Sequence, residues 1–403
     1  MQPVDRLHPP AWLAHRDVRR LVEVLACPAG PPRAVGGAVR DAVLGLPAGD
    51  VDLATPLPPD QVIQRLSEAG IRVVPTGVEH GTVTAVLSHR PIEVTSLRRD
   101  VETFGRKARV AFTDDWGADA ARRDLTMNAL YADPDGTLYD PVGGLADARA
   151  GRVRFIGDPA ERLAEDGLRL LRFFRFHARF GRGVPDPDGL AACRAAAAML
   201  DHVSQERIWA ELAKLLATRD PAPTLMAMEP AGLLARVLPE ARDLTRLARL
   251  TRVEPVAPTT IRRLAALAPG ADPEATLRRL RGPVADARHW SQALVAERLL
   301  AAGAGGFDVV DRCGVAAAVD GACLRLADGA RVPAALWRWR TQPLPRLPVV
   351  GSDLMAFGLT PGPALGRHLD WIRTWWRQQE GKPDRAACLA AWQAGVGLDG
   401  TAP

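Results

Sequence analysis

Hydrophobic and polar positions alternate with two different periods along the chain. Between residues 33 and 97, short apolar runs of period two are mixed with amphipathic stretches, whereas helical spacing dominates beyond residue 159. These periods predict strands over 33–35, 51–54 and 71–74 and helices over 18–25, 38–46 and 59–69. We therefore expect an α+β fold, with a small mixed-sheet head in front of a long helical region.

The end of the predicted head contains a hairpin, a charged stretch and a connector. Residues 76–97 alternate in polarity on both sides of a turn near Ser88–Arg90, which predicts a β-hairpin. Ser96–Asp119 carries many charges and few aligned apolar positions, so we predict a mobile loop that can act as a lid, with a disordered linker as the alternative. The turn-rich connector Leu138–Pro159 follows, and we expect the head to end in it near residue 150.

The first candidate site is the sequence RAVGGAVRDAVLGLPAGDVDLAT, residues 33–55. Gly36 and Gly37 let the backbone approach an anion at the start of a helix, where free N–H groups favour phosphate. Asp50 and Asp52 flank one Val, and alternate side chains of an extended strand point to the same face. Because adjacent carboxylates favour a hard divalent cation such as Mg²⁺, we predict a metal site beside a phosphate site.

Glu93 is a candidate third carboxylate of this metal site. It lies in the second strand of the predicted hairpin, between Ile92 and Val94. If that strand lies beside the strand of Asp50 and Asp52, the Glu93 carboxylate comes close to the metal. An outward-facing charge on an edge strand is the alternative interpretation.

Charge and cysteine content narrow the class of protein. The 403-residue chain has a net charge of +5, and all of its 52 cationic residues except Lys107, Lys214 and Lys382 are arginines. Arginine suits bidentate contacts with phosphate and base edges, although a compositional bias towards Ala, Pro and Gly explains the same excess. Five scattered cysteines without a CxxC pair indicate a reducing compartment, with neither a zinc site nor a disulfide framework. Without an apolar leader or membrane-length apolar run, the expected location is cytoplasmic.

A second polar cluster lies in ARRDLTMNAL, residues 121–130, which we predict to form one helix. Asp124 and Asn128 are four residues apart and so share a helix face. A carboxylate and an amide together suit ribose hydroxyls, and the pair Arg122 and Arg123 suits a triphosphate. A surface helix with local ion pairs is the alternative.

A third cluster lies in residues 159–180, which have the pattern of one long helix. Asp166 and Arg169 are three residues apart, so their side-chain tips can meet. Arginine can donate to N3 and O2 of cytosine or to N1 of adenine, and a carboxylate can accept from the exocyclic amino group of either base. Guanine and uracil present the reverse order, so this pair would select C or A; an ordinary helix salt bridge is the alternative.

The predicted helix Ser204–Leu216 contains Arg207 and Glu211 four residues apart, where they can form an ion pair. We interpret this helix as a support for the preceding one.

Taken together, these motifs resemble the bacterial class II CCA-adding tRNA nucleotidyltransferase / poly(A) polymerase family, within the DNA polymerase β-like superfamily. Its catalytic signature is similar to Gly36-Gly37 with Asp50-Val51-Asp52, and its ribose and triphosphate motif to Arg122-Arg123-Asp124 with Asn128. Asp140-Pro141, Gly143-Gly144 and Asp147 match its connector, Glu165-Asp166-x-x-Arg169 its protein-template motif, and Glu206-Arg207 with Glu211 the supporting helix. Gly351–Gly366 is similar to a tail segment of the family.

The resemblance implies four parts. These are a nucleotidyltransferase head over 1–150, a helical neck with the nucleotide-selecting helix over 151–220, a helical body over 221–310 and an RNA-binding helical tail over 311–403. Ser96–Asp119 falls where full CCA-adding members keep a flexible loop that helps the change from C to A.

The resemblance also implies an activity, namely addition of C, C and A from CTP and ATP to the tRNA 3′ end without a nucleic-acid template. The metal residues are then Asp50, Asp52 and Glu93, with Mg²⁺ as cofactor and the two aspartates as catalytic groups. The expected nucleotide-binding residues are Gly36, Gly37, Arg40, Arg122, Asp124, Asn128, Asp166 and Arg169, with neck support from Arg172, Arg207 and Glu211. Neither a membrane nor a protein partner is expected.

Three alternatives stay open at this point. A poly(A) polymerase or an A-adding enzyme would act on other RNA 3′ ends. A non-catalytic RNA-binding protein is disfavoured by the intact Asp50 and Asp52. A transferase of small molecules is disfavoured by the long helical region after the head.

Overall fold

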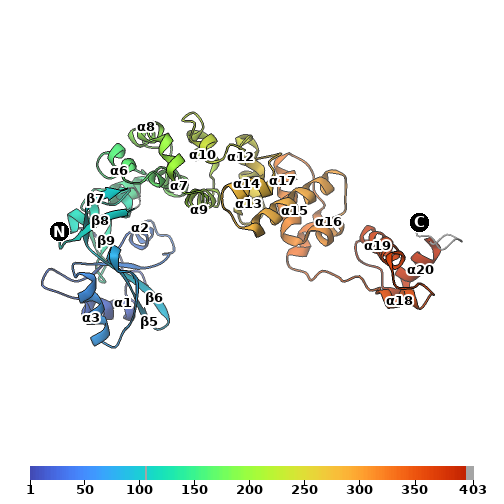
Figure 1. Cartoon of the computed structure of the whole chain (residues 1–403), viewed down its shortest axis with the longest axis horizontal. Coiled ribbons are helices and arrows are strands. Elements are labelled where there is room, and N and C mark those ends of the chain that lie inside the picture. Colours follow the sequence, from blue (N-terminus) through green and yellow to red (C-terminus); the bar gives the residue numbers. More distant parts are fainter. Residues whose placement is uncertain (105–106, 396–403) are drawn as a thin grey trace. The chain divides into compact units, whose positions relative to one another are not determined.

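The structure is a computed structural model that describes residues 1–104 and 107–395 (Figure 1). The chain divides into two compact units, Met1–Pro239 and Glu240–Pro403. Strands lie in the first unit, and the described part of the second unit is helical. This arrangement confirms the predicted α+β class.

An eight-stranded mixed sheet forms the centre of the head, in the order β1-β10-β9-β2-β3-β6-β5-β4. Its strands are β1 (Pro3–Arg6), β2 (Arg33–Val35), β3 (Asp52–Thr55), β4 (Arg72–Gly77), β5 (Thr82–Leu87), β6 (Arg90–Ser96), β9 (Tyr131–Ala132) and β10 (Thr137–Tyr139). All neighbouring strands are antiparallel except β3 and β6, whose parallel register places Asp52 opposite Glu93. The predicted hairpin is confirmed as β5–β6.

Short helices accompany this sheet. They are α1 (Arg16–Val24), α2 (Gly37–Val43), α3 (Pro59–Glu68), α4 (Trp116–Ala121) and α5 (Gly144–Ala150), with 3₁₀ turns at Val78–His80 and Thr126–Asn128. A core cluster that includes Val35, Ala54, Trp116 and Tyr131 joins β2, β3, α4 and β9. This core fixes the ends of β2 and β3, where the first candidate site begins.

Two predictions for the head are wrong in secondary structure. Ser96–Asp119 is not an irregular loop, because β7 (Arg98–Phe104) and β8 (Lys107–Phe112) pair as an antiparallel hairpin. Residues 121–130 are not one helix either, because α4 ends at Ala121 and only Thr126–Asn128 makes a 3₁₀ turn. In both places charged residues hide the apolar period. β7 and β8 pair with each other, and Leu125 makes a β-bridge with the distant Phe155, so backbone pairing determines the structure there.

The helical part of the first unit consists of α6 (Pro159–Glu165), α7 (Leu168–Phe180), α8 (Pro187–Ala195), α9 (Gln205–Leu216), α10 (Ala222–Met228) and α11 (Leu233–Val237), with a 3₁₀ helix at Ala197–His202. The single helix predicted over 159–180 is therefore interrupted. Asp166 has the extended angles φ −156° and ψ 111°, and its Oδ1 accepts a hydrogen bond from the Leu168 N–H at 3.0 Å. Asp166 thus ends one helix and caps the next, and α7 then packs along α9.

The second unit contains α12 (Leu244–Val253), α13 (Thr260–Leu267), α14 (Pro273–Arg279), α15 (Val284–Ala301), α16 (Gly306–Cys313), α17 (Val315–Ala327), α18 (Gly351–Met355), α19 (Pro363–Gln378) and α20 (Arg385–Gly395), with a 3₁₀ helix at Ala334–Arg340. The helices α15 and α17 pack closely. A buried ion cluster joins α13 to α17 and to the end of α12, because Arg262 of α13 donates to Asp320 of α17 at 2.8 Å and to Glu254 after α12 at 2.6 Å.

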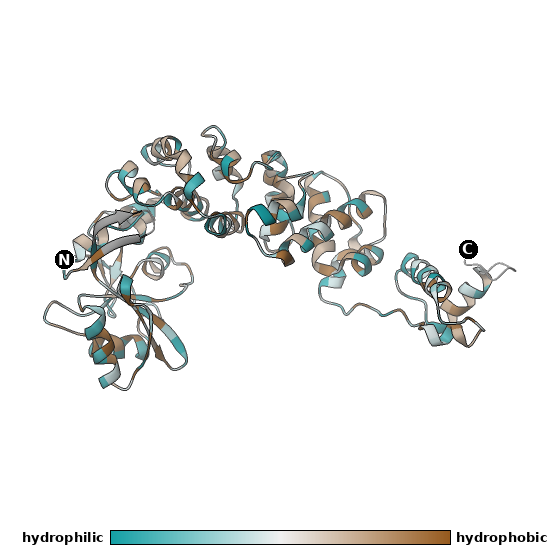
Figure 2. Cartoon of the chain, viewed as in Figure 1, coloured by the Kyte–Doolittle hydropathy of each residue, from teal (hydrophilic) through white to brown (hydrophobic). Residues whose placement is uncertain are grey.

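Figure 2 shows that the helices of both units mix hydrophobic with hydrophilic residues, as the helical spacing predicted. Within the described ranges, every helix is too short or too polar to cross a membrane. The division of the chain into two units falls after Pro239. The four predicted parts, with limits at 150, 220 and 310, stay a prediction.

Candidate active site

One pocket in the first unit, with a volume of about 550 Å³, brings most of the predicted site residues together. Its wall comes from the turn after β2, the start of α2, the start of β3, the segment 122–128, the break between α6 and α7, α7 itself and α9. It is lined by Val35, Gly36, Gly37, Arg40, Asp52, Arg122, Arg123, Asp124, Asn128, Asp166, Leu168, Arg169, Arg172, Arg175, Phe176 and Arg207. Of the predicted site residues, only Asp50, Glu93 and Glu211 are not in this lining.

The turn after β2 forms because a glycine occupies a position that other residues rarely adopt. Gly36 has φ 74° and ψ −125°, and its N–H donates to the Leu130 carbonyl at 3.0 Å. The chain then enters α2 at Gly37. This geometry brings Arg40, one turn later, to the pocket wall.

Three carboxylates approach one another at the start of β3. Asp52 is half-buried, Asp50 lies in the bend just before the strand, and Glu93 is exposed on the neighbouring parallel strand β6. Burial, together with the negative charges of Glu93 and Asp50, raises the pKa of Asp52 to about 6, against an opposing effect of Arg123. The strand of Glu93 therefore lies beside the strand of Asp52, with the two residues opposite each other. The Glu93 carboxylate is close enough for its charge to raise the pKa of Asp52.

Asp119 is a site residue that sequence reasoning missed. Its carboxylate is 1% exposed and accepts from Arg122 Nη2 at 2.6 Å, from Arg123 Nη2 at 2.9 Å and from the Tyr131 hydroxyl at 2.9 Å. Burial alone would raise the pKa of Asp119, but Arg123 and Arg122 hold it below its usual range. The signal was present as helical spacing, since Asp119 precedes the two arginines by three and four residues.

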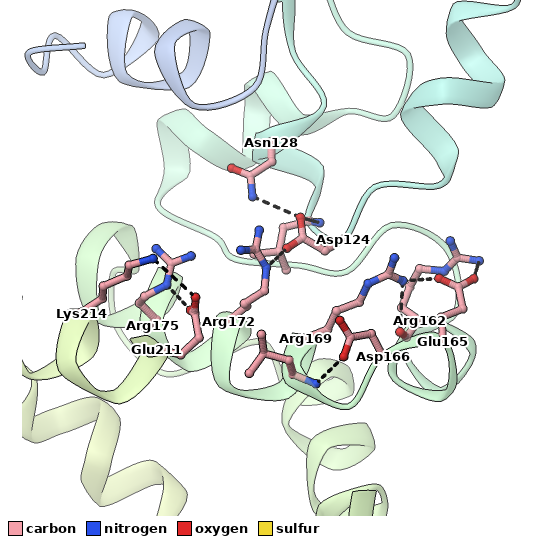
Figure 3. Close-up of polar contacts among 12 residues, drawn as sticks. Asp124, Asn128, Arg162, Glu165, Asp166, Arg169, Arg172, Arg175, Glu211 and Lys214 are labelled. Carbon is pink, nitrogen blue, oxygen red and sulfur yellow. Dashed lines mark hydrogen bonds and ion pairs between the residues drawn. The ribbon is translucent and has the colours of Figure 1, made fainter. Parts of the chain in front are cut away.

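Asp124 and Asn128 form a row of hydrogen bonds with arginines from two helices. Figure 3 shows the part of this row that joins Asn128, Asp124 and Arg172. Asn128 Nδ2 donates to Asp124 Oδ1 at 3.2 Å, and Arg172 Nε of α7 donates to Asp124 Oδ2 at 2.6 Å. At the other end of the row, Arg40 Nη1 of α2 donates to Asn128 Oδ1 at 2.6 Å. Burial would raise the pKa of Asp124, but Arg172 and Asn128 hold it low, so the carboxylate is charged.

The connector after β10 holds the 3₁₀ turn of Asn128 in place. Asp147 is fully buried and accepts from the Thr126 hydroxyl at 2.8 Å and from Arg154 at 2.9 Å. A Cβ on Gly144 would lie 2.0 Å from the Thr126 carbonyl oxygen, so only glycine allows this close approach.

The neck residues are paired differently from the sequence-based expectation. Asp166 Oδ2 accepts from Arg207 Nη2 at 2.6 Å, and Arg169 forms an ion pair with Glu165. The predicted pair of Arg207 and Glu211 is wrong, because Glu211 accepts from Arg175 of α7 instead (Figure 3). A break at Asp166 turns its carboxylate towards α9, which periodicity alone does not reveal.

Comparisons with known proteins agree with this geometry. A model described as "Poly A polymerase head domain" matches residues 32–154, and one described as "Probable RNA and SrmB- binding site of polymerase A" matches residues 185–244. A "CCA-adding enzyme" of Latilactobacillus sakei is 31% identical over 357 residues, which cover 83% of this chain and 87% of the relative. The chain belongs to the CCA-adding enzyme family.

Other members of this family match over different lengths. "CCA tRNA nucleotidyltransferase 1, mitochondrial" of Danio rerio is 46% identical over 187 residues, which cover 46% of this chain and 43% of the relative. The chain thus spans less than half the length of this relative. The structure of the Bacillus stearothermophilus CCA-adding enzyme in complex with CTP has a TM-score of 0.76 and 26% identity, covering 94% of this chain and 97% of that one.

Nucleotidyltransferases related to the CCA-adding enzyme family generally use a divalent metal ion. Asp50, Asp52 and Glu93 fit such an ion, because three carboxylates meet at the start of β3, where burial first and then the charges of Glu93 and Asp50 raise the pKa of Asp52. Within residues 1–104 and 107–395, no group of three His, Cys, Asp or Glu side chains already has metal-ligand spacing. The roles predicted for the site residues therefore stay predictions.

Proposed function

We propose that this member of the CCA-adding enzyme family adds C, C and A to the 3′ end of tRNA from CTP and ATP, and releases pyrophosphate. The observation that carries the proposal is the single pocket shared by Asp52, the Asp124–Asn128 row and the Asp166–Arg169 segment. Asp52 suits a metal-dependent transfer, the Asp124–Asn128 row suits a ribose, and the Asp166–Arg169 segment suits the edge of a base. The 3′ oxygen of the RNA forms a bond to the α-phosphorus, and the bond from that phosphorus to the bridging oxygen breaks.

The metal of the proposal is Mg²⁺, held by Asp50 and Asp52 with Glu93 beside them. When bound, it supplies positive charge that lowers the pKa of the RNA 3′-hydroxyl and stabilises the pyrophosphate. Arg122 and Arg123 face the same pocket and balance the triphosphate charge. Asp124 and Asn128 bind the sugar, so most of the acceleration comes from positioning and charge stabilisation. A phosphate-binding role for Gly36, Gly37 and Arg40, and a cytoplasmic location, stay predictions.

Three RNAs supplied with Mg²⁺ and with CTP, ATP or both test the proposal. We expect three nucleotides to be added to tRNA that lacks CCA, one A to tRNA that ends in CC, and none to an unrelated RNA. Long A tails on the unrelated RNA would overturn the proposal in favour of a poly(A) polymerase. Activity restricted to the tRNA ending in CC would identify an A-adding enzyme.

Replacing Asp119 with Asn is expected to raise KM for both CTP and ATP by about tenfold or more, and to lower stability by about 3 kcal/mol. The amide cannot accept from Arg122, Arg123 and Tyr131 together, because one of its groups is itself a donor. Steady-state kinetics and thermal unfolding measure the two effects.

Tyr131→Phe is the matched control, because it removes one donor to Asp119 and leaves the ion pairs intact. Its KM values should change much less than those of Asp119→Asn. A folded Asp119→Asn protein with unchanged KM would contradict the positioning of the arginines by this carboxylate.

A further inference from the structure

The guanidinium of Arg40 is buried between the head and α7, and it donates hydrogen bonds to the side chains of Asp41 and Asn128. Arg40 is 5% exposed, and its Cζ lies 4.1 Å from the centre of the Phe180 ring. Its Nε and Nη2 donate to Asp41 Oδ1 at 2.9 and 2.7 Å, and its Nη1 donates to Asn128 Oδ1 at 2.6 Å. The Asp41 carboxylate therefore holds the fork of Arg40 in one orientation, which leaves Nη1 directed at the amide.

These contacts determine which way the Asn128 amide points. Arginine has donors only, so the atom of Asn128 that faces Arg40 must be the oxygen. An ionised carboxylate has acceptors only, so the atom that faces Asp124 must be the nitrogen. The low pKa of Asp124, held down by Arg172 against the effect of burial, keeps this carboxylate ionised. The orientation of the amide thus follows from the chemistry of both neighbours.

The same contacts determine what the row offers to a ligand in the pocket. Asn128 Nδ2 has two hydrogens, and the one not given to Asp124 has no protein acceptor among the described residues. Asp124 Oδ2 keeps one lone pair, because Arg172 takes the other and Asn128 and the Leu125 N–H take those of Oδ1. A donor beside an acceptor complements two vicinal hydroxyl groups, each of which can both donate and accept.

We infer that Arg40 is a positioning residue that fixes the Asn128 amide for recognition of the two ribose hydroxyls, and thereby sets the preference for ribonucleotides over deoxyribonucleotides. This inference rests on the proposed function, because it assigns the Asp124–Asn128 row to the sugar of the incoming nucleotide. A deoxyribonucleotide lacks the 2′-hydroxyl and leaves one of these buried polar groups unpaired, which is the strongest basis for rejecting it. Without Arg40 the Asn128 amide is held only by its contact with Asp124, so its orientation is less firmly fixed and the penalty for the missing hydroxyl decreases.

Two variants of Arg40 test the inference. Arg40→Met removes the donors and keeps an aliphatic chain over Phe180, whereas Arg40→Lys keeps a charge for Asp41 without the guanidinium fork. The kcat/KM of CTP relative to dCTP, and of ATP relative to dATP, should fall by about tenfold in each variant. In equilibrium binding, the Kd values for CTP and dCTP should likewise become more similar in each variant. This measurement tests the inference without depending on the transfer reaction.

Arg33→Met is the matched control. Arg33 also pairs with a carboxylate, Asp133 at 3.0 Å, and lies over an aromatic ring, Tyr139 at 3.8 Å, but it does not line the pocket. We expect Arg33→Met to leave both sugar ratios unchanged. Equal losses for CTP and dCTP in the Arg40 variants would overturn the inference and leave Arg40 with a structural or phosphate-binding role. If the Met variant does not fold, an unchanged sugar ratio in the Lys variant would overturn it. If the unmodified protein adds no nucleotide to any of the RNAs, that result would instead count against the proposed function.

Discussion

Replacing Asp52 with Asn is expected to abolish nucleotide addition and at the same time to raise the thermal stability of the metal-free protein. The pKa of Asp52 rises from 3.8 to about 6 in the folded chain, because burial, Glu93 and Asp50 disfavour its charge. The folded state thus binds the proton more tightly than the unfolded state, so stability falls as pH rises from 3.8 to about 6. Asparagine carries no charge and removes this cost.

The gain should be on the order of 1 kcal/mol after solvent screening is considered, or about 2–4 °C in the unfolding midpoint. Thermal unfolding at pH 8 with a chelator measures it, and the difference from the unmodified protein should shrink at pH 4.5. Asp114→Asn, at an exposed aspartate of the same head, is the control and should leave the midpoint nearly unchanged. Near-normal turnover of Asp52→Asn would refute the assignment of Asp52 to the metal.

Replacing Asp166 with Ala is expected chiefly to damage base choice. The carboxylate can accept from the amino group of cytosine or adenine, and its loss removes the mismatch that rejects guanine and uracil. Discrimination against GTP and UTP should fall by about 10–100-fold, with a smaller change for CTP and ATP themselves. Single-nucleotide addition with each of the four triphosphates measures this ratio.

The control for Asp166→Ala must also release an arginine from its ion pair. Asp166 is held by Arg207, so its removal also frees an arginine. Asp201→Ala likewise frees an arginine, Arg236 at 2.7 Å, but it lies on the exposed surface of the same unit. Discrimination among the four bases should be intact in Asp201→Ala. Unchanged discrimination in Asp166→Ala would count against a template role.

Local sequence patterns predicted correctly those strands and side-chain contacts of the head that depend on residues close in the sequence. Asp52 and Glu93 were assigned to strands from alternation, and both lie in strands that pair in parallel. Gly36 and Gly37 were predicted to lie at the start of a helix, and α2 begins at Gly37. The contact of Asp124 with Asn128 was also correct, although the predicted helix around it was wrong.

Partners that are distant in sequence could not be predicted. Arg207 was assigned to Glu211, four residues away, but it pairs with Asp166 on another element. The break at Asp166 has no Pro to mark it, and periodicity continues through it because α6 and α7 both bury apolar faces. Asp119 was overlooked although Arg122 and Arg123 follow it by three and four residues, because its burial and its third partner, Tyr131, become apparent only in the folded chain.

The parallel pairing of β3 with β6 has a consequence for the order in which the head folds. Asp52 and Glu93 are neighbours in this pairing although α3, β4 and β5 lie between them in the sequence, so the pairing closes a long segment of chain. Such non-local pairings form late, because closing a long segment costs entropy before the contacts repay it. A nascent chain that ends before β6 therefore carries both aspartates but lacks the complete carboxylate group. We expect high-affinity divalent-ion binding to appear with the slowest refolding phase, and binding in the first phase would exclude this order.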